Sequence, residues 1–474
     1  MLRPILVVAA TLVAALSATL RVTEAAETPH RPESQQEYWA QIDRKDWSAA
    51  VAAAEQLVAA ARSTAAQQPL ALAEALTLLG NAQFGARNFE AAETAFNESL
   101  KLTEARVGAA SPQLLDPLRG LGYALAAGER HKEAIPPLER ALLIDRRSYG
   151  LYDMAQQKVL RQLAESLVKV GRPDDAQRHV AYLVQLGERV YGKRDPRQVP
   201  ILCFAAGWHG DLGDFISARA IYRAAIDIVD RKLGPNDLAS VEPLRGLADT
   251  YTQELYFSTL GLRTQTLERQ PTSADGSTNQ QRDLNPRYLG TEGEKALERA
   301  VKLLEAQPPS AHDTLLETLI QSGDWFQIKH MPEKAMPYYR RAAALSATLL
   351  AQAAATPPAA GATAATSAQV DPLSFPVRVY YQTPSQATRN VLLPAEQVDE
   401  RFVQVQFTVT DSGDVEDAKI TEANGTQRES ADTLAAIRAA RFRPKFVNGE
   451  PVETTGMTNR EVFRTRKESV DGGR

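Results

Sequence analysis

The chain has 474 residues, too many for one hydrophobic core and enough for several, unless the chain forms an extended repeat array. Its charge is nearly balanced, with a formal net charge of -4 and a pI near 6.0. Proteins that bind nucleic acid carry a clustered basic excess, so the composition predicts no nucleic-acid partner.

The N-terminus has the pattern of a secretory signal peptide, which we assign to residues 1–26. Arg3 precedes an apolar run from Pro4 to Leu20, and Ala25 and Ala26 supply the small residues that cleavage requires. The run is about 17 residues long, at the lower limit for spanning a bilayer, so an uncleaved membrane anchor stays open as an alternative. The sequence therefore predicts an exported protein that contacts the membrane only if this segment is retained.

A 42-residue period runs through most of the chain, with small residues in two registers that keep a constant offset from each other. This pattern predicts repeated helical hairpins, because two closely crossing helices tolerate only Gly or Ala where their backbones meet. The predicted crossing positions on the first helices are Gly80, Gly122, Ala164, Ala206 and Ala248. Those on the second helices are Ala50, Ala92, Ala134, Ala176 and Ala218.

Two further features of each repeat support the hairpin prediction. A large residue follows each second-helix alanine by one helical turn, where it fills the space beside the crossing. A glycine ends each second helix, since glycine adopts left-handed backbone conformations without strain. The large residues are Phe96, Leu138, Val180 and Tyr222, and the glycines are Gly108, Gly150, Gly192 and Gly234.

These features resemble tetratricopeptide repeats in the 42-residue form of kinesin light chain-like arrays. We assign residues 34–350 to a mainly α, superhelical α-α solenoid of about seven hairpins. A polar stretch at 264–290 interrupts the repeat whose first helix holds Ala248, and we interpret this stretch as a surface loop. Gly323 and Ala335 have the same offset as Gly80 and Ala92, and they predict a seventh hairpin.

Three arginines share one position in the repeat, three residues before the first-helix small residue. In tetratricopeptide arrays this position faces the concave groove, so the resemblance implies a site for a carboxylate or an acidic peptide. The alternative is that ion pairs within the helices satisfy the arginines, as Glu165 follows Arg161 by four residues. The candidate groove residues are Arg119, Arg161, Arg245, Asn81 and Tyr123.

The hydrophobic pattern changes after residues 351–372, an Ala, Pro and Thr-rich stretch that we assign as a linker. The run FVQVQFTV, from Phe402 to Val409, alternates and predicts a strand with one strongly apolar face. A turn at Ser412-Gly413 then leads to a second predicted strand near Val415 to Glu422.

One helix and one hairpin complete this predicted region. The run SADTLAAIRAARF is amphipathic, with Leu434, Ile437 and Ala440 facing inward, and Ser430 or Asp432 is its predicted cap. The stretch RFRPKFVNGEPVE follows, in which Pro444 forbids further helix and Asn448-Gly449 supplies a hairpin turn. The region is therefore predicted to be a small α+β domain.

This region resembles the C-terminal domain of TonB, the periplasmic protein that couples inner-membrane energy to outer-membrane transporters. We assign residues 373–466 to this domain and 467–474 to a polar tail. The resemblance is most specific in the spacing of Phe442, Pro444, Asn448, Gly449 and Pro451. It implies a strand that pairs with an extended peptide of a transporter. The predicted strand-pairing residues are Val403, Val405, Phe407 and Val409.

The sequence contains no motif for a metal centre, a nucleotide or a catalytic nucleophile, so we expect no cofactor and no enzyme activity. Cys203 is the only cysteine, and its apolar surroundings predict a buried, inert thiol.

We interpret the chain as a periplasmic interaction scaffold with protein or peptide partners in the Gram-negative envelope, among them an outer-membrane receptor. Two alternatives stay open. One is a TonB-type energy transducer anchored by an uncleaved Pro4 to Leu20 helix, although the long Pro-rich spacer of TonB is absent. The other is an envelope or cell-wall assembly factor, because a fold does not by itself fix a function.

Overall fold

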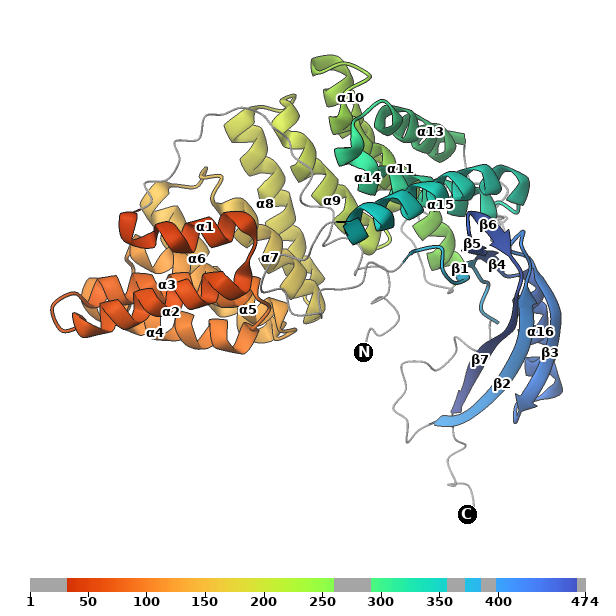
Figure 1. Ribbon diagram of the computed structural model, residues 1–474, viewed down its shortest axis with the longest axis horizontal. Coiled ribbons are helices and arrows are strands. Elements are labelled where there is room, and N and C mark those ends of the chain that lie inside the picture. The colour runs from red at the N-terminus through yellow and green to blue at the C-terminus, as the bar shows by residue number, and fades with distance from the viewer. Residues whose placement is uncertain (1–31, 260–290, 356–370, 385–397, 467–474) are drawn as a thin grey trace, which may run out of the picture. The chain divides into compact units, whose positions relative to one another are not determined.

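The computed structural model describes residues 32–259, 291–355, 371–384 and 398–466 (Figure 1). The described residues fall into two compact units, with the boundary between Ile201 and Leu202. Several assignments lie outside the described residues: the signal peptide at 1–26, the insertion at 264–290, the tail at 467–474 and most of the linker at 351–372.

The first unit contains four helical hairpins within its described residues, and each helix packs on the next in chain order. A hairpin consists of two helices joined by a short turn, as the 42-residue period predicts. The helices are α1 (Gln36–Arg44), α2 (Trp47–Ser63), α3 (Pro69–Gly85), α4 (Phe89–Val107), α5 (Leu115–Ala127), α6 (His131–Tyr149), α7 (Gln156–Lys169) and α8 (Pro173–Tyr191).

The helices of the second unit also pair, although residues 260–290 separate α11 from α13. Three further hairpins, α9 with α10, α11 with α13, and α14 with α15, bring the described total to the predicted seven. The helices are α9 (Val199–Asp211), α10 (Phe215–Lys232), α11 (Val241–Thr259), α13 (Thr291–Glu305), α14 (His312–Ile328) and α15 (Pro332–Ala355).

The predicted crossing positions are buried, and the large residues pack against them. All eight predicted crossing alanines have exposed fractions of 0%. A Cβ added to Gly80 would lie 2.6 Å from Phe96 Cε1, and one added to Gly122 would lie 2.4 Å from Leu138 Cγ. Phe96 and Leu138 therefore occupy the volume that a first-helix side chain would need.

The segments between hairpins repeat two features, of which the sequence pattern predicted one. The predicted glycines after α4, α6, α8 and α10 all have positive φ, from +83° to +101°. Three residues after each glycine, a side-chain oxygen accepts a backbone N–H and starts the next turn or helix. These capping residues are Ser111, Asp153, Asp195 and Asp237, which share the 42-residue spacing.

The C-terminal region of the second unit is the predicted α+β domain. Its main sheet has three antiparallel strands in the order β3-β2-β7, and two smaller pairs, β1-β4 and β5-β6, accompany it. The elements are β1 (Val377–Tyr380), β2 (Val398–Val409), β3 (Val415–Ala423), α16 (Gln427–Ala439), β4 (Arg441–Arg443), β5 (Lys445–Val447), β6 (Glu450–Val452) and β7 (Thr454–Arg466).

One apolar face of the main sheet forms the domain's core. The alternating residues of β2 pack with Ile437 of α16, Phe442 of β4 and Phe463 of β7. The predicted turn at Gly413 and the hairpin turn at Asn448-Gly449 are present, with positive φ at all three residues. The predicted fold, α-α repeats followed by a small α+β domain, is therefore confirmed.

The predicted helix cap is wrong. The N-terminal cap of α16 is Thr426, four residues before Ser430, and its side chain accepts the backbone N–H of Glu429. The Glu429 carboxylate accepts the backbone N–H of Thr426 in return, which completes a reciprocal capping box. The helix begins at this box because it satisfies two backbone donors at once.

Candidate functional site

The groove arginines of the first unit have partners within the chain. Arg119 forms an ion pair with Asp145 of α6 and lies 3.8 Å from Asp116 of its own helix. Asp145 is 1% exposed, and burial raises the pKa of its carboxyl group while Arg119 opposes the rise. Arg161 donates a hydrogen bond of 2.8 Å to the carbonyl of Pro200. The two arginines are thus held by different elements.

Asn81 and Tyr123 occupy the position just after the first-helix glycine. Asn81 is exposed, whereas Tyr123 is half-buried, and burial raises the pKa of its hydroxyl to about 12. Tyr123 therefore remains neutral at physiological pH and offers a hydroxyl rather than a charge. Their role in binding a peptide remains a prediction.

Arg245, in the second unit, bridges two hairpins. Its guanidinium lies 3.1 Å from the Glu317 carboxylate and donates to Gln321 at 3.2 Å, both on α14. Gln321 donates back to the Arg245 carbonyl at 3.1 Å. These partners belong to a later hairpin, so spacing along one helix could not reveal them. The alternative from the sequence was ion pairing within one helix, whereas these partners of Arg245 lie on another helix.

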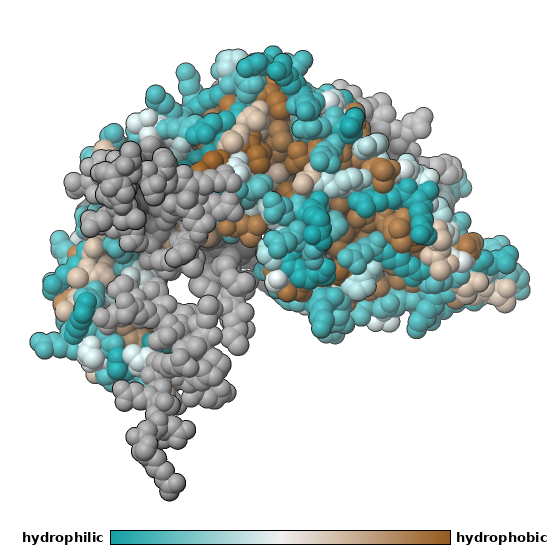
Figure 2. Space-filling model, turned by 180° about the vertical axis from the view of Figure 1, so that it is seen from behind, coloured by the Kyte–Doolittle hydropathy of each residue, from teal (hydrophilic) through white to brown (hydrophobic). Residues whose placement is uncertain are grey.

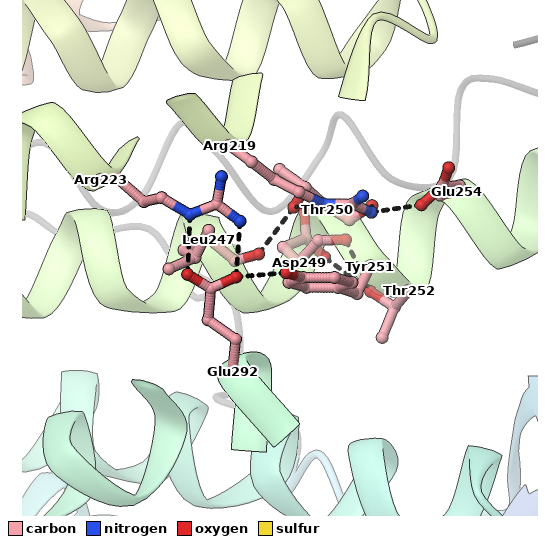
Figure 3. Close-up of polar contacts among 9 residues, drawn as sticks. All are labelled: Arg219, Arg223, Leu247, Asp249, Thr250, Tyr251, Thr252, Glu254 and Glu292. Carbon is pink, nitrogen blue, oxygen red and sulfur yellow. Dashed lines mark hydrogen bonds and ion pairs between the residues drawn. The ribbon is translucent and has the colours of Figure 1, made fainter. Parts of the chain in front are cut away.

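A polar network that the sequence pattern did not predict joins α10 to α11 (Figure 3). Arg219 donates to the Thr250 hydroxyl at 3.1 Å and forms an ion pair with Glu254. Its guanidinium carbon lies 3.8 Å from the centre of the Tyr251 ring, a cation–π contact. The side chains of Arg219 and Glu254 are only 11% and 9% exposed, so this charge pair is part of the helix packing.

The same network attaches α13, the first described helix after residue 290. Arg223 donates two hydrogen bonds of 2.7 Å to the Glu292 carboxylate, which also accepts the Tyr251 hydroxyl (Figure 3). The hydrogen bonds from Arg223 are the main cause that lowers the pKa of Glu292 to about 2. Arg299 of α13 pairs with Asp230 of α10 in addition. Two arginine pairs therefore connect α13 to α10.

The predicted strand-pairing residues lie on the wrong strand for that role. Val403, Val405, Phe407 and Val409 belong to β2, which pairs with β3 on one side and with β7 on the other. Their side chains are at most 3% exposed and form the domain core. The prediction that these residues pair with a partner is therefore wrong, because a central strand has no open edge.

The outer edge of β7 is better suited to pairing than the outer edge of β3. Within the described residues, each of these strands pairs only with β2 in the main sheet. β3 has two register shifts against β2 and carries Glu416, Asp417, Lys419 and Glu422, features that discourage edge pairing. β7 is longer, with 13 residues, and has one register shift, near Gly456. Its charged residues, Arg460, Glu461, Arg464 and Arg466, lie in its second half, and its run from 454 to 459 carries no charge.

Exposed apolar residues offer a second surface, in the first unit. Figure 2 shows apolar areas among hydrophilic side chains on one face of the molecule. Near the end of α6, four large apolar or aromatic residues are each at least 49% exposed. Exposure of this kind within one segment is typical of protein interaction sites. The residues are Leu143, Tyr149, Leu151 and Tyr152.

Comparison with known families supports both predicted regions, the helical repeats and the C-terminal domain. The family model of the tetratricopeptide repeat matches residues 71–147. The model of the Gram-negative bacterial TonB protein C-terminal domain matches residues 402–465, which include the whole main sheet except its ends. The chain carries a tetratricopeptide repeat region and a TonB-type C-terminal domain. These families are generally not catalytic.

Solved structures that resemble this chain include repeat proteins. BtubC (BKLC) from P. vanneervenii is 16% identical, with 55% of this chain and 91% of that chain covered, at a TM-score of 0.40. A tetratricopeptide repeat protein from Parabacteroides merdae is 13% identical, with 66% and 92% covered, at a TM-score of 0.38. No curated protein matches the sequence.

Neither a metal site nor a membrane-spanning helix occurs in the described part of the chain. No group of three or more His, Cys, Asp or Glu side chains is placed there to hold a metal ion. No helix in the described ranges is both long and apolar enough to cross a membrane. Cys203 is buried, as predicted.

Proposed function

We propose that the protein is a non-enzymatic, periplasmic scaffold of the Gram-negative envelope that binds partner proteins through its TonB-type domain and its helical repeats. The TonB-type domain supports an envelope role, and both families support protein partners. The signal peptide pattern at the N-terminus supports export. The role requires no cofactor.

The outer edge of β7, which in the described part of the chain pairs with no strand other than β2, carries this proposal. A strand edge presents unpaired N–H and C=O groups, and an extended partner segment can satisfy them by adding a strand to the sheet. The β2-β7 ladder extends from Val398↔Arg466 to Val409↔Thr454, so β7 is held by β2 along nearly its whole length. A partner segment would therefore meet a preformed template, and the protein would lose little conformational entropy on binding.

Site-specific photocrosslinking in the producing cells tests this role. A photoreactive residue at Thr458 lies on β7, and one at Gln406 lies directly opposite on β2, on the same face of the sheet. We expect a crosslinked partner at Thr458 and little product at Gln406. Competition by an extended peptide from the captured protein would then show that the edge is the site.

Equal crosslinking at both positions would contradict strand pairing, because a partner lying on the open sheet face would reach both residues. The identity of the captured protein separates the remaining alternatives. An outer-membrane receptor would favour a TonB-type energy transducer, whereas a cell-wall enzyme would favour an assembly factor. A second copy of the chain would show self-pairing instead.

A further inference from the structure

The candidate groove position of the last hairpin, just after the first-helix small residue, contacts the TonB-type domain. This position is Asp324 in α14, and in the earlier hairpins it is Asn81, Tyr123, Glu165, Gly207 and Asp249. Asp324 accepts two hydrogen bonds from Arg443 of β4, at 3.0 and 2.7 Å. The position at which we expected a foreign ligand is thus occupied by the chain's own TonB-type domain.

This ion pair is largely shielded from water and has further donors. The Arg443 and Asp324 side chains are 11% and 22% exposed, and Arg443 also donates to the Pro372 carbonyl at 3.3 Å. The Tyr339 hydroxyl, from α15, donates to the same Asp324 carboxylate at 2.7 Å. A two-point arginine–carboxylate pair with further donors is the geometry that a lasting buried charge pair requires.

Near the end of α14, Gln327 makes a second attachment. Its side chain is 0% exposed, and its amide donates to the carbonyls of Ser412 and Phe442, at 2.7 and 2.9 Å. A Cβ added to Gly413 would lie 2.2 Å from this amide nitrogen. The turn between β2 and β3 therefore needs glycine to approach α14 this closely.

Aromatic and polar contacts surround the two attachments. Tyr339 and Phe446 of β5 meet edge to face, with ring centres 6.3 Å apart, and His330 meets Tyr380 of β1 at 5.7 Å. Ser346 of α15 donates to Asp371 at 3.0 Å. The contacts come from three strands, from the turn at Gly413 and from the segment before β1, so the domain is oriented by many points and not by one.

We propose that α14, α15 and the TonB-type domain form one permanent module, in which Arg443 acts as an internal ligand of the last hairpin. Opening the contact would break the ion pair of Arg443 and the two hydrogen bonds of Gln327 at once. It would also expose Tyr339 and Phe446, now 0% and 5% exposed, to water, which opposes a reversible latch. Two consequences follow. The groove available to a foreign peptide ends before α14, and the β7 edge has a fixed direction relative to α14 and α15. This inference does not depend on the proposed function.

Cleavage of the full-length chain tests the proposal. A protease site is inserted within residues 356–370, the protein is cut under native conditions, and the products are separated by size-exclusion chromatography at about 1 μM. We expect the cut C-terminal fragment to elute with the repeats. Separation of the fragments at this concentration, with both still folded by circular dichroism, would overturn the proposal.

Two variants identify the contacts responsible. Gln327→Glu keeps the shape of the side chain but replaces the amide N–H donor, which faces two carbonyls, with an acceptor. Arg443→Ala removes the ion pair with Asp324. We expect each variant to weaken reassociation of the cut fragments by about 100-fold. Arg340→Ala is the matched control, because its ion pair with Glu450 at 3.2 Å is exposed. We expect the control to change reassociation less than about fivefold. Equal effects in all three variants would contradict the assigned roles.

Discussion

Glycine at a helix crossing matters because of what lies opposite it. Gly122 faces Leu138 across its hairpin, whereas a Cβ added to Gly128, just after the same helix, would meet only ordinary contacts of 3.4 Å or more. We expect Gly122→Ala to lower the free energy of unfolding of this region by about 1–3 kcal/mol, because Leu138 must leave its rotamer.

Gly128→Ala is the control for that substitution. Its φ of -80° suits alanine, so it should be neutral or raise stability by about 0.5 kcal/mol. Denaturant unfolding followed by circular dichroism measures both variants. Similar losses in the two variants would show that helix crowding is not the cause.

The Glu292 carboxylate predicts a pH dependence of stability. Its folded pKa of about 2 lies below the ordinary value of 4.5, so its contribution is complete above pH 4.5 and is lost as the pH falls toward 2. Glu292 and Arg223 are 39% and 51% exposed, so we expect about 1 kcal/mol or less after solvent screening.

Glu292→Gln should remove this part of the acid sensitivity. The variant and the wild type should differ most in free energy of unfolding above about pH 5 and should converge near about pH 2.5. A constant difference across this range would mean that the carboxylate's charge is not the stabilising feature.

At the scale of single residues, the sequence predicted the packing residues better than the polar ones. Gly80, Phe96 and their equivalents follow a fixed spacing, so periodicity reveals them. Arg119 and Arg245 share a repeat position, but their partners Asp145 and Glu317 depend on how separate helices meet. No spacing rule along one helix contains that information.

At the scale of elements, the start of α16 illustrates two competing signals. Ser430 and Asp432 are good caps, yet Thr426 with Glu429 forms the reciprocal box and the helix begins there. We expect Thr426→Ala to destabilise the TonB-type domain by about 1 kcal/mol, and Ser430→Ala to have little effect. Hydrogen exchange of α16 measures both, and a larger effect of Ser430→Ala would contradict the assigned cap.

For a related reason, the sequence could not predict which strand lies at the edge of the sheet. The alternation in Val403, Val405 and Phe407 correctly predicts a strand with one buried face. Alternation is the same for a central strand and for an edge strand, because it reports burial of the face and not pairing of the backbone. Only the ladder with β7, the last strand of the described chain, makes β2 central.

At the scale of the whole molecule, the repeat count, the domain order and the α+β character were all predictable. The attachment of the TonB-type domain to α14 was not, since the sequence suggested only a linker between them. That attachment predicts coupled dynamics: Arg443→Ala should raise hydrogen exchange in α14 as well as in β4, although the two elements are far apart in the sequence.

Arg340→Ala should leave exchange in both segments near wild type, because its partner Glu450 is exposed. An increase confined to β4 in the Arg443→Ala protein would show that the hairpin is stable without the domain. The experiment needs no cleavage and reports on the intact chain.

The pairing of Arg223 with Glu292 and of Arg299 with Asp230 has a consequence for protein engineering. Together with buried apolar residues of α13 such as Leu297 and Ala300, these contacts hold the helix through its own side chains. Closing a longer connection costs only about 0.6 kcal/mol for each doubling of its length. A fluorescent protein or an affinity tag inserted between residues 264 and 290 should therefore leave the repeats intact, giving a labelling position remote in sequence from the β7 edge.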